Sequence, residues 1–278
     1  MTYQPSLKLP DFFLIGAPKA GTTALYHSLC QHPDIYMPAL KEPHYFTFAG
    51  QIPVFPGPAG DYFARVAIKR PLEYAALFAG IRDEKIVGEA STTYLGSPVA
   101  AKRISKSIPH ARIIALLRQP AERAYSQYNF YRFHGVESAE TFSQALGEEA
   151  DKIKNGWSFI HFHRSTSLYF QQLRSYFDVF PRENIRILLH DEWSTHPVSI
   201  LQDTYSFLGV NDNFEADIRH SNVTLLPDTT MDASNSRKPA VPLPLDPATR
   251  RQLTDAYRED ILKTQDLIGR DLSHWLIA

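Results

Sequence analysis

The chain has 278 residues, of which 44% are hydrophobic and 21% are charged, as in a globular protein large enough to bury a full core. Twenty-nine Lys and Arg side chains nearly balance thirty Asp and Glu, and this net charge of −1 argues against a surface that binds nucleic acid. A single cysteine, Cys30, excludes an intramolecular disulfide and a metal site built from cysteines, and it suits a reducing compartment.

Two features of the sequence bear on membranes. No run of apolar residues reaches the roughly 18 to 20 that a bilayer-spanning helix needs. The stretch from Met1 to Asp11 lacks the basic and then apolar layout of a signal peptide. The sequence therefore predicts a cytoplasmic protein without a membrane or nucleic-acid partner, folded as a single domain over residues 1–278.

Short apolar runs alternate with helical patterns along the chain. Continuous apolar runs of this kind are typical of strands that are buried on both faces of a sheet. Their alternation with helices predicts a three-layer α/β/α fold around a central parallel sheet. The expected strands are 12–16, 85–89, 111–117 and 185–189, and the expected helices are 22–31, 97–108, one opening at Pro120, 167–180, and one that begins at Asp246 and Pro247 and stops near Gly269.

Two segments are too rich in turn-forming residues for helix or strand. Residues 50–60 contain three prolines and three glycines, and residues 221–247 are rich in Pro, Asp, Ser and Thr. Long loops in a globular domain are usually either functional or disordered. Each segment is therefore predicted to be a loop that forms a wall of a binding site, with disorder as the alternative.

The segment GAPKAGTT, residues 16–23, lies between the first expected strand and the first expected helix. Its two glycines are five residues apart, as in a Walker-type loop, where backbone N–H groups and a helix N-terminus bind phosphate. Thr22 stands where an ATP- or GTP-hydrolysing loop carries lysine, and the lysine of this loop is Lys19 instead. We therefore predict a phosphate site in which the Lys19 ammonium meets a leaving-group oxygen; a Gly-rich turn without a ligand is the alternative. The site consists of Pro18, Lys19, Ala20, Gly21, Thr22 and Thr23.

The third expected strand is followed by Arg118 and not by an aspartate that could hold Mg²⁺. This favours a phosphate site that needs no metal. Arg118 stands where ligands bind to parallel sheets, and Ser126 follows about two helical turns later, so the two predict a second phosphate site. A salt bridge from Arg118 to Glu122 is the alternative.

Arg237 and Lys238 form a third basic point, within the late loop. We predict that these two side chains fold over a bound nucleotide. Simple solvation of loop charges is the alternative.

Along most of its length the chain resembles the sulfotransferases that use 3′-phosphoadenosine 5′-phosphosulfate (PAPS), in the branch related to heparan sulfate sulfotransferases. FFLIGAPKAGTTAL (12–25) is similar to the family's 5′-phosphosulfate loop, and LRQPAERAYSQY (117–128) is similar to its 3′-phosphate motif. KEPHYF (41–46) resembles the segment that carries the acceptor-activating base. Further similar segments are 87–95, 167–181, 207–209 and 268–275.

The resemblance implies a P-loop-like sulfotransferase fold, PAPS as sulfuryl donor without a metal, and a hydroxyl or amine of a small molecule or saccharide as acceptor. It implies that Lys19 donates to the bridging oxygen while Thr22 and Thr23 hold the 5′-phosphate. Glu42 is the implied base, and burial among Tyr45, Phe46 and Phe48 is expected to raise its pKa. His44 is the alternative base, or simply a packed or surface histidine.

Two departures from the family pattern concern the acceptor. Ala90 stands where heparan-type members commonly carry lysine, and a single cysteine cannot form the disulfide of their late loop. These departures favour a stand-alone enzyme that acts on a smaller molecule than a glycosaminoglycan.

Two other classes of function stay open at this stage. One is an ATP-dependent phosphotransferase that uses Mg²⁺, against which the missing Gly-Lys-Thr and the missing metal carboxylate argue. The other is a nucleotide-binding module without catalysis, against which Lys19 and Glu42 argue. His161 and His163 share one face of a possible strand, but no carboxylate or cysteine lies near them in the sequence, so no metal site is predicted.

Overall fold

A computed structural model of the chain describes residues 8–50, 52–218 and 244–277. The described residues fall into two compact units, each assembled from separate stretches of the chain. The prediction of one domain over residues 1–278 stays a prediction. Of the described residues, unit 1 contains 8–50, 52, 67–117 and 175–218, and unit 2 contains 53–66, 118–174 and 244–277.

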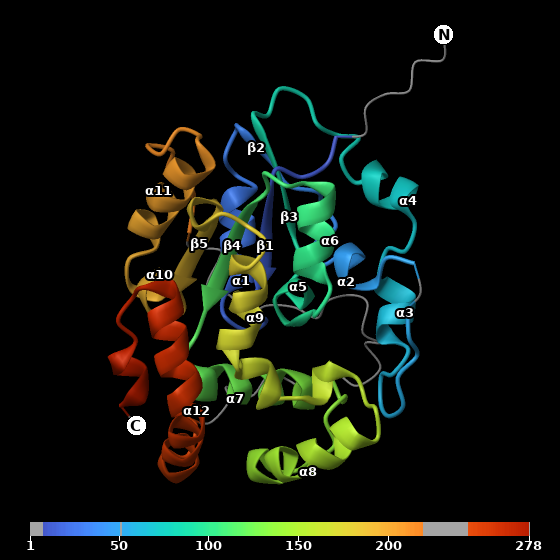
Figure 1. The fold of residues 1–278 in the computed structure, drawn as a ribbon, viewed down its shortest axis with the longest axis vertical. Helices are drawn as coiled ribbons and strands as arrows, with labels where there is room; N and C mark the ends of the chain where they lie inside the picture. The colour runs from blue at the N-terminus through green and yellow to red at the C-terminus, as the bar shows by residue number, and fades with distance from the viewer. Residues whose placement is uncertain (1–7, 51, 219–243, 278) are drawn as a thin grey trace. The chain divides into compact units, whose positions relative to one another are not determined.

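Unit 1 contains a five-stranded sheet in the order β2-β3-β1-β4-β5 (Figure 1). All four neighbouring pairs are parallel, which confirms the predicted parallel sheet. The four predicted strands are present to within one residue at each end. A fifth, β2, has only two residues and was not predicted, because two residues carry no readable pattern. The strands are β1 (Phe12–Gly16), β2 (Ile35–Tyr36), β3 (Ile86–Ala90), β4 (Arg112–Leu117) and β5 (Ile185–Leu189).

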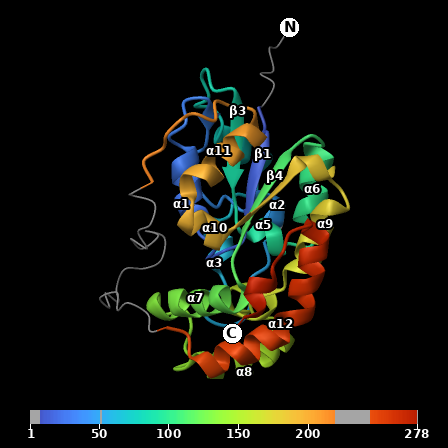
Figure 2. The same cartoon turned by 90° about the vertical axis from the view of Figure 1, so that its left-hand side faces the viewer.

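Helices cover both faces of this sheet. Figure 2 shows α1, α10 and α11 on one face and α5 and α6 on the other, which confirms the three-layer prediction. Because both faces are covered, every residue of β1 and β3 is buried. The helices of this unit are α1 (Thr22–Leu29), α2 (Tyr45–Phe48), α4 (Pro71–Ala76), α5 (Thr93–Gly96), α6 (Ala100–Ser107), α10 (His190–Thr195) and α11 (Pro197–Leu208).

Gly88 allows β3 to lie close to its neighbours. It pairs with Phe12 of β1 in the sheet register. A Cβ atom at Gly88 would lie 2.2 Å from the Phe12 ring and 2.4 Å from the Met37 sulfur. A larger residue at this position would therefore displace the core of unit 1.

Unit 2 is helical. Its helix α7 packs against α12 through Gln119, whose side chain caps α7 and donates to Thr254 Oγ1 and to the Trp275 carbonyl oxygen. As predicted, α12 begins after an Asp246 cap and ends at Gly269. The helices are α3 (Tyr62–Val66), α7 (Pro120–Phe133), α8 (Phe142–Lys154), α12 (Pro247–Ile268) and the short turns η1 (Phe159–His161), η2 (Ser165–Ser167) and η4 (Ser273–Leu276); α9 (Tyr169–Phe177) begins in unit 2 and ends in unit 1.

The two predicted loops differ in what can be said of them. Residues 52–61 contain no helix or strand, as predicted. Most of 221–247 lies outside the described residues. No helix in the described part of the chain combines the length and the apolar composition that crossing a bilayer requires.

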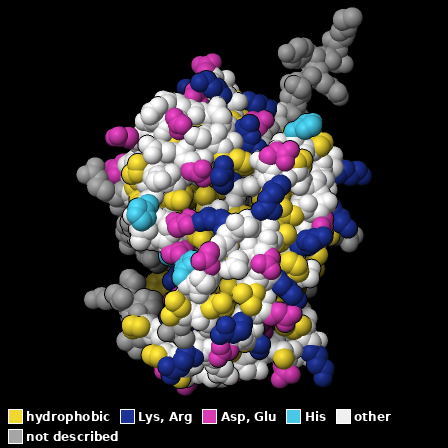
Figure 3. Space-filling model, turned by 60° about the vertical axis from the view of Figure 1, so that its left-hand side comes forward, with side chains coloured by type: hydrophobic (Ala, Val, Ile, Leu, Met, Phe, Trp, Pro, Cys, Tyr) yellow, Lys and Arg dark blue, Asp and Glu magenta, His cyan; other side chains and the backbone are white. Residues whose placement is uncertain are grey.

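On the face drawn in Figure 3, Lys and Arg side chains are interspersed with Asp and Glu, in keeping with the net charge of −1.

Candidate active site

The loop between β1 and α1 has the backbone expected of an anion-binding turn. Lys19 and Gly21 both adopt left-handed conformations, with φ of 67° and 97°. No side chain caps the N-terminus of α1, which is also true of α2, α4, α5, α6, α10 and α11. The first N–H groups of α1 are therefore left for another acceptor. Within the loop Thr22 is buried, Lys19 is half-buried and Thr23 is exposed.

Three polar groups contact the Glu42 carboxylate and hold it in place. The Thr92 backbone N–H donates to Oε2 at 2.7 Å, and the Thr92 hydroxyl donates to Oε1 at 3.0 Å. Lys41 Nζ lies 2.7 Å from Oε1. These contacts orient the carboxylate, and the side chain stays 22% exposed.

The pKa of Glu42 differs from the expected direction. Burial acts to raise it, as the sequence suggested. The Lys41 ammonium, His44 and the Thr92 N–H together outweigh burial and hold the pKa of Glu42 below its ordinary value. The expectation of a raised pKa was wrong because it counted the aromatic neighbours and omitted the adjacent lysine.

His44 stands beside Glu42 but is less accessible. Its Nδ1 lies 3.1 Å from the Thr93 hydroxyl and 3.6 Å from Glu42 Oε2. Its side chain is only 4% exposed. Of the two candidate bases, Glu42 has the more exposed side chain.

Thr92 joins the Glu42 segment to the start of the phosphate loop. β1 and β3 are adjacent and parallel, with Leu14 paired to Ala90. Beyond the end of β3, the Thr92 carbonyl oxygen lies 3.2 Å from the point that a Cβ atom on Gly16 would occupy. The residue that orients Glu42 is therefore in contact range of the first residue of the loop. Unit 1 brings the loop, Glu42 and His44 to one edge of the sheet.

Several residues around Glu42 were not identified from the sequence. Lys41 is adjacent to Glu42, and its charge was a readable signal. Thr92 and Glu89 lie about fifty residues away, and only the packing of the segment after β2 along the end of β3 brings them near Glu42. Burial raises the pKa of Glu89 to about 7, against hydrogen bonds from Tyr94 and Tyr74 that lower it.

Arg118 and Ser126 belong to unit 2. Arg118 Nη2 lies 3.8 Å from Glu122 Oε2, at the outer limit of an ion pair, and its side chain is 26% exposed. Burial lowers the pKa of Arg118, although arginine remains charged in any case. The Tyr169 hydroxyl donates to the Arg118 carbonyl oxygen at 2.8 Å and so fixes its backbone. Ser126 is half-buried in α7. Their role in a second phosphate site stays a prediction.

Arg237 and Lys238, predicted to fold over a nucleotide, lie outside the described residues.

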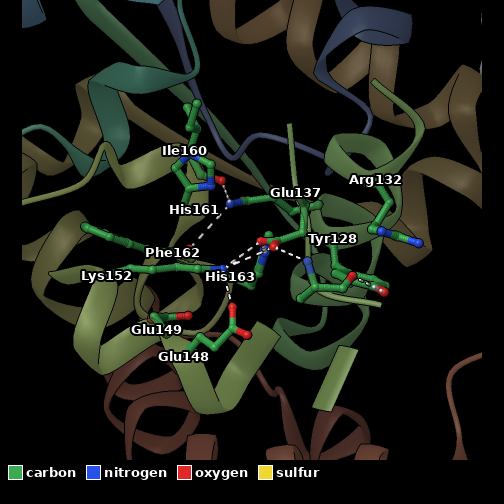
Figure 4. Close-up of polar contacts among 12 residues, drawn as sticks. Tyr128, Arg132, Glu137, Glu148, Glu149, Lys152, Ile160, His161, Phe162 and His163 are labelled. Atoms are coloured by element: carbon green, nitrogen blue, oxygen red, sulfur yellow. Dashed lines mark hydrogen bonds and ion pairs between the residues drawn. The ribbon is translucent and has the colours of Figure 1, made fainter. Parts of the chain in front are cut away.

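His161 and His163 lie in a turn and not in the strand that the sequence suggested. His161 Nε2 contacts the Pro58 carbonyl oxygen at 2.9 Å, and burial lowers the pKa of His161. Figure 4 shows His163 beside Glu137 and Lys152, with Nε2 2.9 Å from Glu137. Burial would raise the pKa of Glu137, but His163, a backbone N–H and Lys152 lower it to about 2. Both histidines thus have structural partners, and the described residues contain no group of three or more side chains placed to hold a metal.

Comparison with known families gives a match over most of the chain. A model of the sulfotransferase domain matches residues 9–238. Among curated proteins, the membrane-associated sulfotransferase kil1 of Dictyostelium discoideum is 26% identical over 74% of this chain and 57% of its own length. Human carbohydrate sulfotransferase 15 is 25% identical over 96% of this chain and 54% of its own length. The chain thus spans about half the length of these curated relatives.

Solved structures give a match along almost the whole chain. A sulfotransferase from Alicyclobacillus acidocaldarius is 34% identical, with a TM-score of 0.82 over 96% of this chain and 99% of that one. Mouse sulfotransferase SULT7A1, solved in complex with PAP, has a TM-score of 0.51 and 18% identity over 91% of this chain and 84% of that one, and so resembles it in fold.

Proposed function

We propose that this chain, which belongs to the sulfotransferase family, transfers the sulfuryl group of PAPS to a hydroxyl or amine of a small-molecule or saccharide acceptor. The observation that carries the proposal is the Glu42 carboxylate, oriented by Thr92 at the edge of the sheet where the phosphate loop begins. A base next to an anion-binding loop is the arrangement that sulfuryl transfer needs.

The loop fits the phosphosulfate end of PAPS. The N-terminus of α1 has no side-chain cap and no acidic residue in its first turn, so its N–H groups and helix dipole favour an anion. Lys19 adds a positive charge within the same turn. When bound, PAPS supplies an activated sulfuryl group and a nucleoside bisphosphate leaving group.

Sulfuryl transfer resembles phosphoryl transfer in that it needs in-line placement and electrostatic stabilisation more than covalent help from the protein. In this proposal Glu42 removes the proton from the acceptor oxygen or nitrogen. Lys19 donates to the bridging oxygen as negative charge grows there. Thr22, Thr23 and the backbone N–H groups of Lys19 and Gly21 hold the 5′-phosphate. The Ala20 N–H, also predicted to bind it, donates instead to the Ala17 carbonyl oxygen at 3.2 Å.

The proposal is tested by incubating the protein with PAPS and a panel of hydroxyl and amine acceptors. Transfer releases adenosine 3′,5′-bisphosphate (PAP) and adds the mass of one sulfo group to the acceptor. Both products should form together and without added metal. Conversion of ATP instead, and only with Mg²⁺, would move the chain to the phosphotransferases.

Two features of the proposal concern scope. Ala90, in place of a lysine, favours small acceptors over glycosaminoglycans. We keep a cytoplasmic location as part of the proposal, although the Dictyostelium relative is named as membrane-associated.

We expect Arg118→Ala to weaken binding of PAP at least tenfold while leaving binding of 5′-AMP nearly unchanged. A charge-assisted contact contributes about 1.5 to 3 kcal/mol, which corresponds to roughly 10-fold or more in affinity. Ser126→Ala should show a smaller loss of the same kind. Calorimetry with both nucleotides measures the effect, with Arg258→Ala, at an exposed position on α12, as the control. Equal losses for both nucleotides would mean that Arg118 supports the fold.

We expect Lys41→Met to move the acid limb of the kcat profile to higher pH. The Lys41 ammonium holds the pKa of Glu42 below its ordinary value, so wild-type activity falls only when the pH drops through that lowered pKa. Without the ammonium, burial raises the pKa of Glu42, and the carboxylate becomes protonated at a higher pH. Lys106→Met, which removes an exposed charge from α6, is the control. An acid limb at the same pH in both variants would contradict the pairing of Lys41 with the base.

A further inference from the structure

The segment that carries Glu42 has an unusual backbone. Glu42 and His44 both lie in the left-handed region, with φ of 63° and 56°. Residues with a Cβ atom rarely adopt this conformation, and they keep it only where the surroundings hold them. The position of the Glu42 carboxylate therefore depends on contacts made by the rest of the segment.

Three backbone N–H groups of this segment donate hydrogen bonds to residues at the end of β3 and the start of α5. The Glu42 N–H donates to the Ala90 carbonyl oxygen at 2.8 Å. The His44 N–H donates to the Ser91 hydroxyl at 3.0 Å. The Phe46 N–H donates to the Tyr94 hydroxyl at 3.2 Å. The last of these contacts depends on how one tyrosine hydroxyl is turned.

Tyr94 is fully buried, and its hydroxyl contacts both Glu89 and Phe46. It donates its single proton to Glu89 Oε2 at 2.6 Å and accepts from the Phe46 N–H. A hydroxyl has one proton and two lone pairs, so an acceptor at Glu89 turns a lone pair toward Phe46. Without Glu89 the hydroxyl would lose the acceptor that orients its proton, and the Phe46 contact would weaken.

Glu89 itself is fully buried in β3. Its Oε2 also accepts from the Tyr74 hydroxyl at 3.0 Å. Its Oε1 has no hydrogen-bond partner among the described residues. Glu89 has no place in the transfer reaction proposed above, yet a buried carboxyl with one unpartnered oxygen is costly unless it has a role or carries a proton.

We propose that Glu89, acting through the Tyr94 hydroxyl, is a positioning residue for the base Glu42. The proposal deepens the proposed function and rests on it. Glu89 touches neither the loop nor Glu42 in any contact described above. It holds Tyr94, Tyr94 holds Phe46, and the segment from Glu42 to Phe46 keeps its left-handed turns.

The protonation state of Glu89 fits this role. Burial and, to a smaller extent, the charge of Glu42 raise its pKa to about 7, against the hydrogen bonds from Tyr94 and Tyr74 that lower it. Below about pH 7 Glu89 is therefore mostly neutral, which avoids a second negative charge near the base. The titratable groups that face it are Tyr74 on α4, Tyr94 on α5, Glu42, and Tyr176 on α9, whose hydroxyl donates to the Tyr94 carbonyl oxygen at 2.8 Å.

Tyr94→Phe and Tyr74→Phe form a matched pair for the test. Each removes one hydroxyl that donates to Glu89 Oε2, but only the Tyr94 hydroxyl also contacts the Glu42 segment. We expect Tyr94→Phe to lower kcat roughly 10- to 100-fold, as a small misplacement of a reacting group can, with PAP affinity unchanged. Tyr74→Phe should lower kcat by less than about threefold. Equal losses of kcat in the two variants, or a loss of PAP affinity equal to the loss of kcat, would overturn the inference.

Glu89→Gln provides a measurement that does not need turnover. A raised pKa means that the folded protein binds more protons than the unfolded chain between about pH 4.3 and about 7. This contribution to the stability of the wild type is fully present below that range and is lost as the pH rises through about 7. The unfolding midpoint of Glu89→Gln, which cannot ionise, should therefore fall less between about pH 5 and pH 8. An equal fall of the unfolding midpoint in both proteins would overturn the inference that Glu89 is neutral at the lower pH.

The two proposals can fail separately. Wild-type protein that transfers nothing from PAPS would overturn the proposed function and the positioning role that rests on it. If the wild type is active and Tyr94→Phe has the same kcat, only the positioning role would be overturned.

Discussion

Glu42→Gln is expected to lower kcat by roughly 10² to 10⁴, the loss typical of a missing general base. Glutamine keeps the size of the side chain and can still accept a hydrogen bond from the Thr92 N–H. It cannot take a proton from the acceptor. PAP affinity should stay within about twofold, since the carboxylate has no part in holding the nucleotide. Turnover at saturating PAPS, together with calorimetry for PAP, measures both quantities.

His44→Asn is the matched control for Glu42→Gln. Asparagine can keep a hydrogen bond to the Thr93 hydroxyl, and His44 is nearly buried, so we expect a much smaller loss of kcat. An active Glu42→Gln together with an inactive His44→Asn would move the base to His44. Activity in both variants would mean that the acceptor arrives already ionised or as a free amine.

Lys19→Ala is expected to lower kcat by roughly 10² to 10³. This is the loss typically seen when one hydrogen-bond donor to a developing oxyanion is removed. PAP affinity should fall much less, because the hydrogen bond to the bridging oxygen strengthens only as the bond to sulfur breaks. Residue 19 has a left-handed backbone with φ of 67°. Alanine and lysine both carry a Cβ atom and adopt this conformation at a similar cost, so the substitution should disturb the loop little. The measurement is kcat at saturating PAPS beside the calorimetric Kd for PAP.

Lys19→Arg separates charge from position in the same loop. Arginine keeps the positive charge but presents it in a planar fork with a different reach. We expect it to keep PAP affinity and to recover only part of the lost turnover. Equal losses of affinity and turnover in Lys19→Ala would make the lysine a ground-state phosphate ligand and remove its catalytic role.

The parts of the fold that could be predicted are those with local signals. β1 and β4 are continuous apolar runs because helices cover both faces of the sheet, and such runs are readable in sequence. The start of α12 was predicted because Asp246 and Pro247 form a cap and a first turn. β2 and the short helix α2 carry no periodic pattern, since their structure comes from packing against longer elements.

The site shows the same division. The phosphate loop was readable because its glycines, lysine and threonines are contiguous between a strand and a helix. The direction of the Glu42 pKa was not, because it depends on a balance between burial, Lys41 and Thr92. Thr92 reaches Glu42 only because the segment after β2 lies along the end of β3, where the Glu42 N–H donates to the Ala90 carbonyl oxygen. Glu89 was passed over for a related reason: its two tyrosine partners come from helices on either side of β3 in the sequence.

We propose above that the phosphate loop binds a PAPS-type nucleotide without a metal. Isothermal titration of the wild-type protein with PAP in the presence of EDTA, beside ATP with and without Mg²⁺, is the decisive experiment. We expect PAP to bind in EDTA, added Mg²⁺ to leave its affinity unchanged, and Lys19→Ala to retain most of that affinity. Binding of ATP only with Mg²⁺, and no heat with PAP in EDTA, would show that the loop serves a different nucleotide.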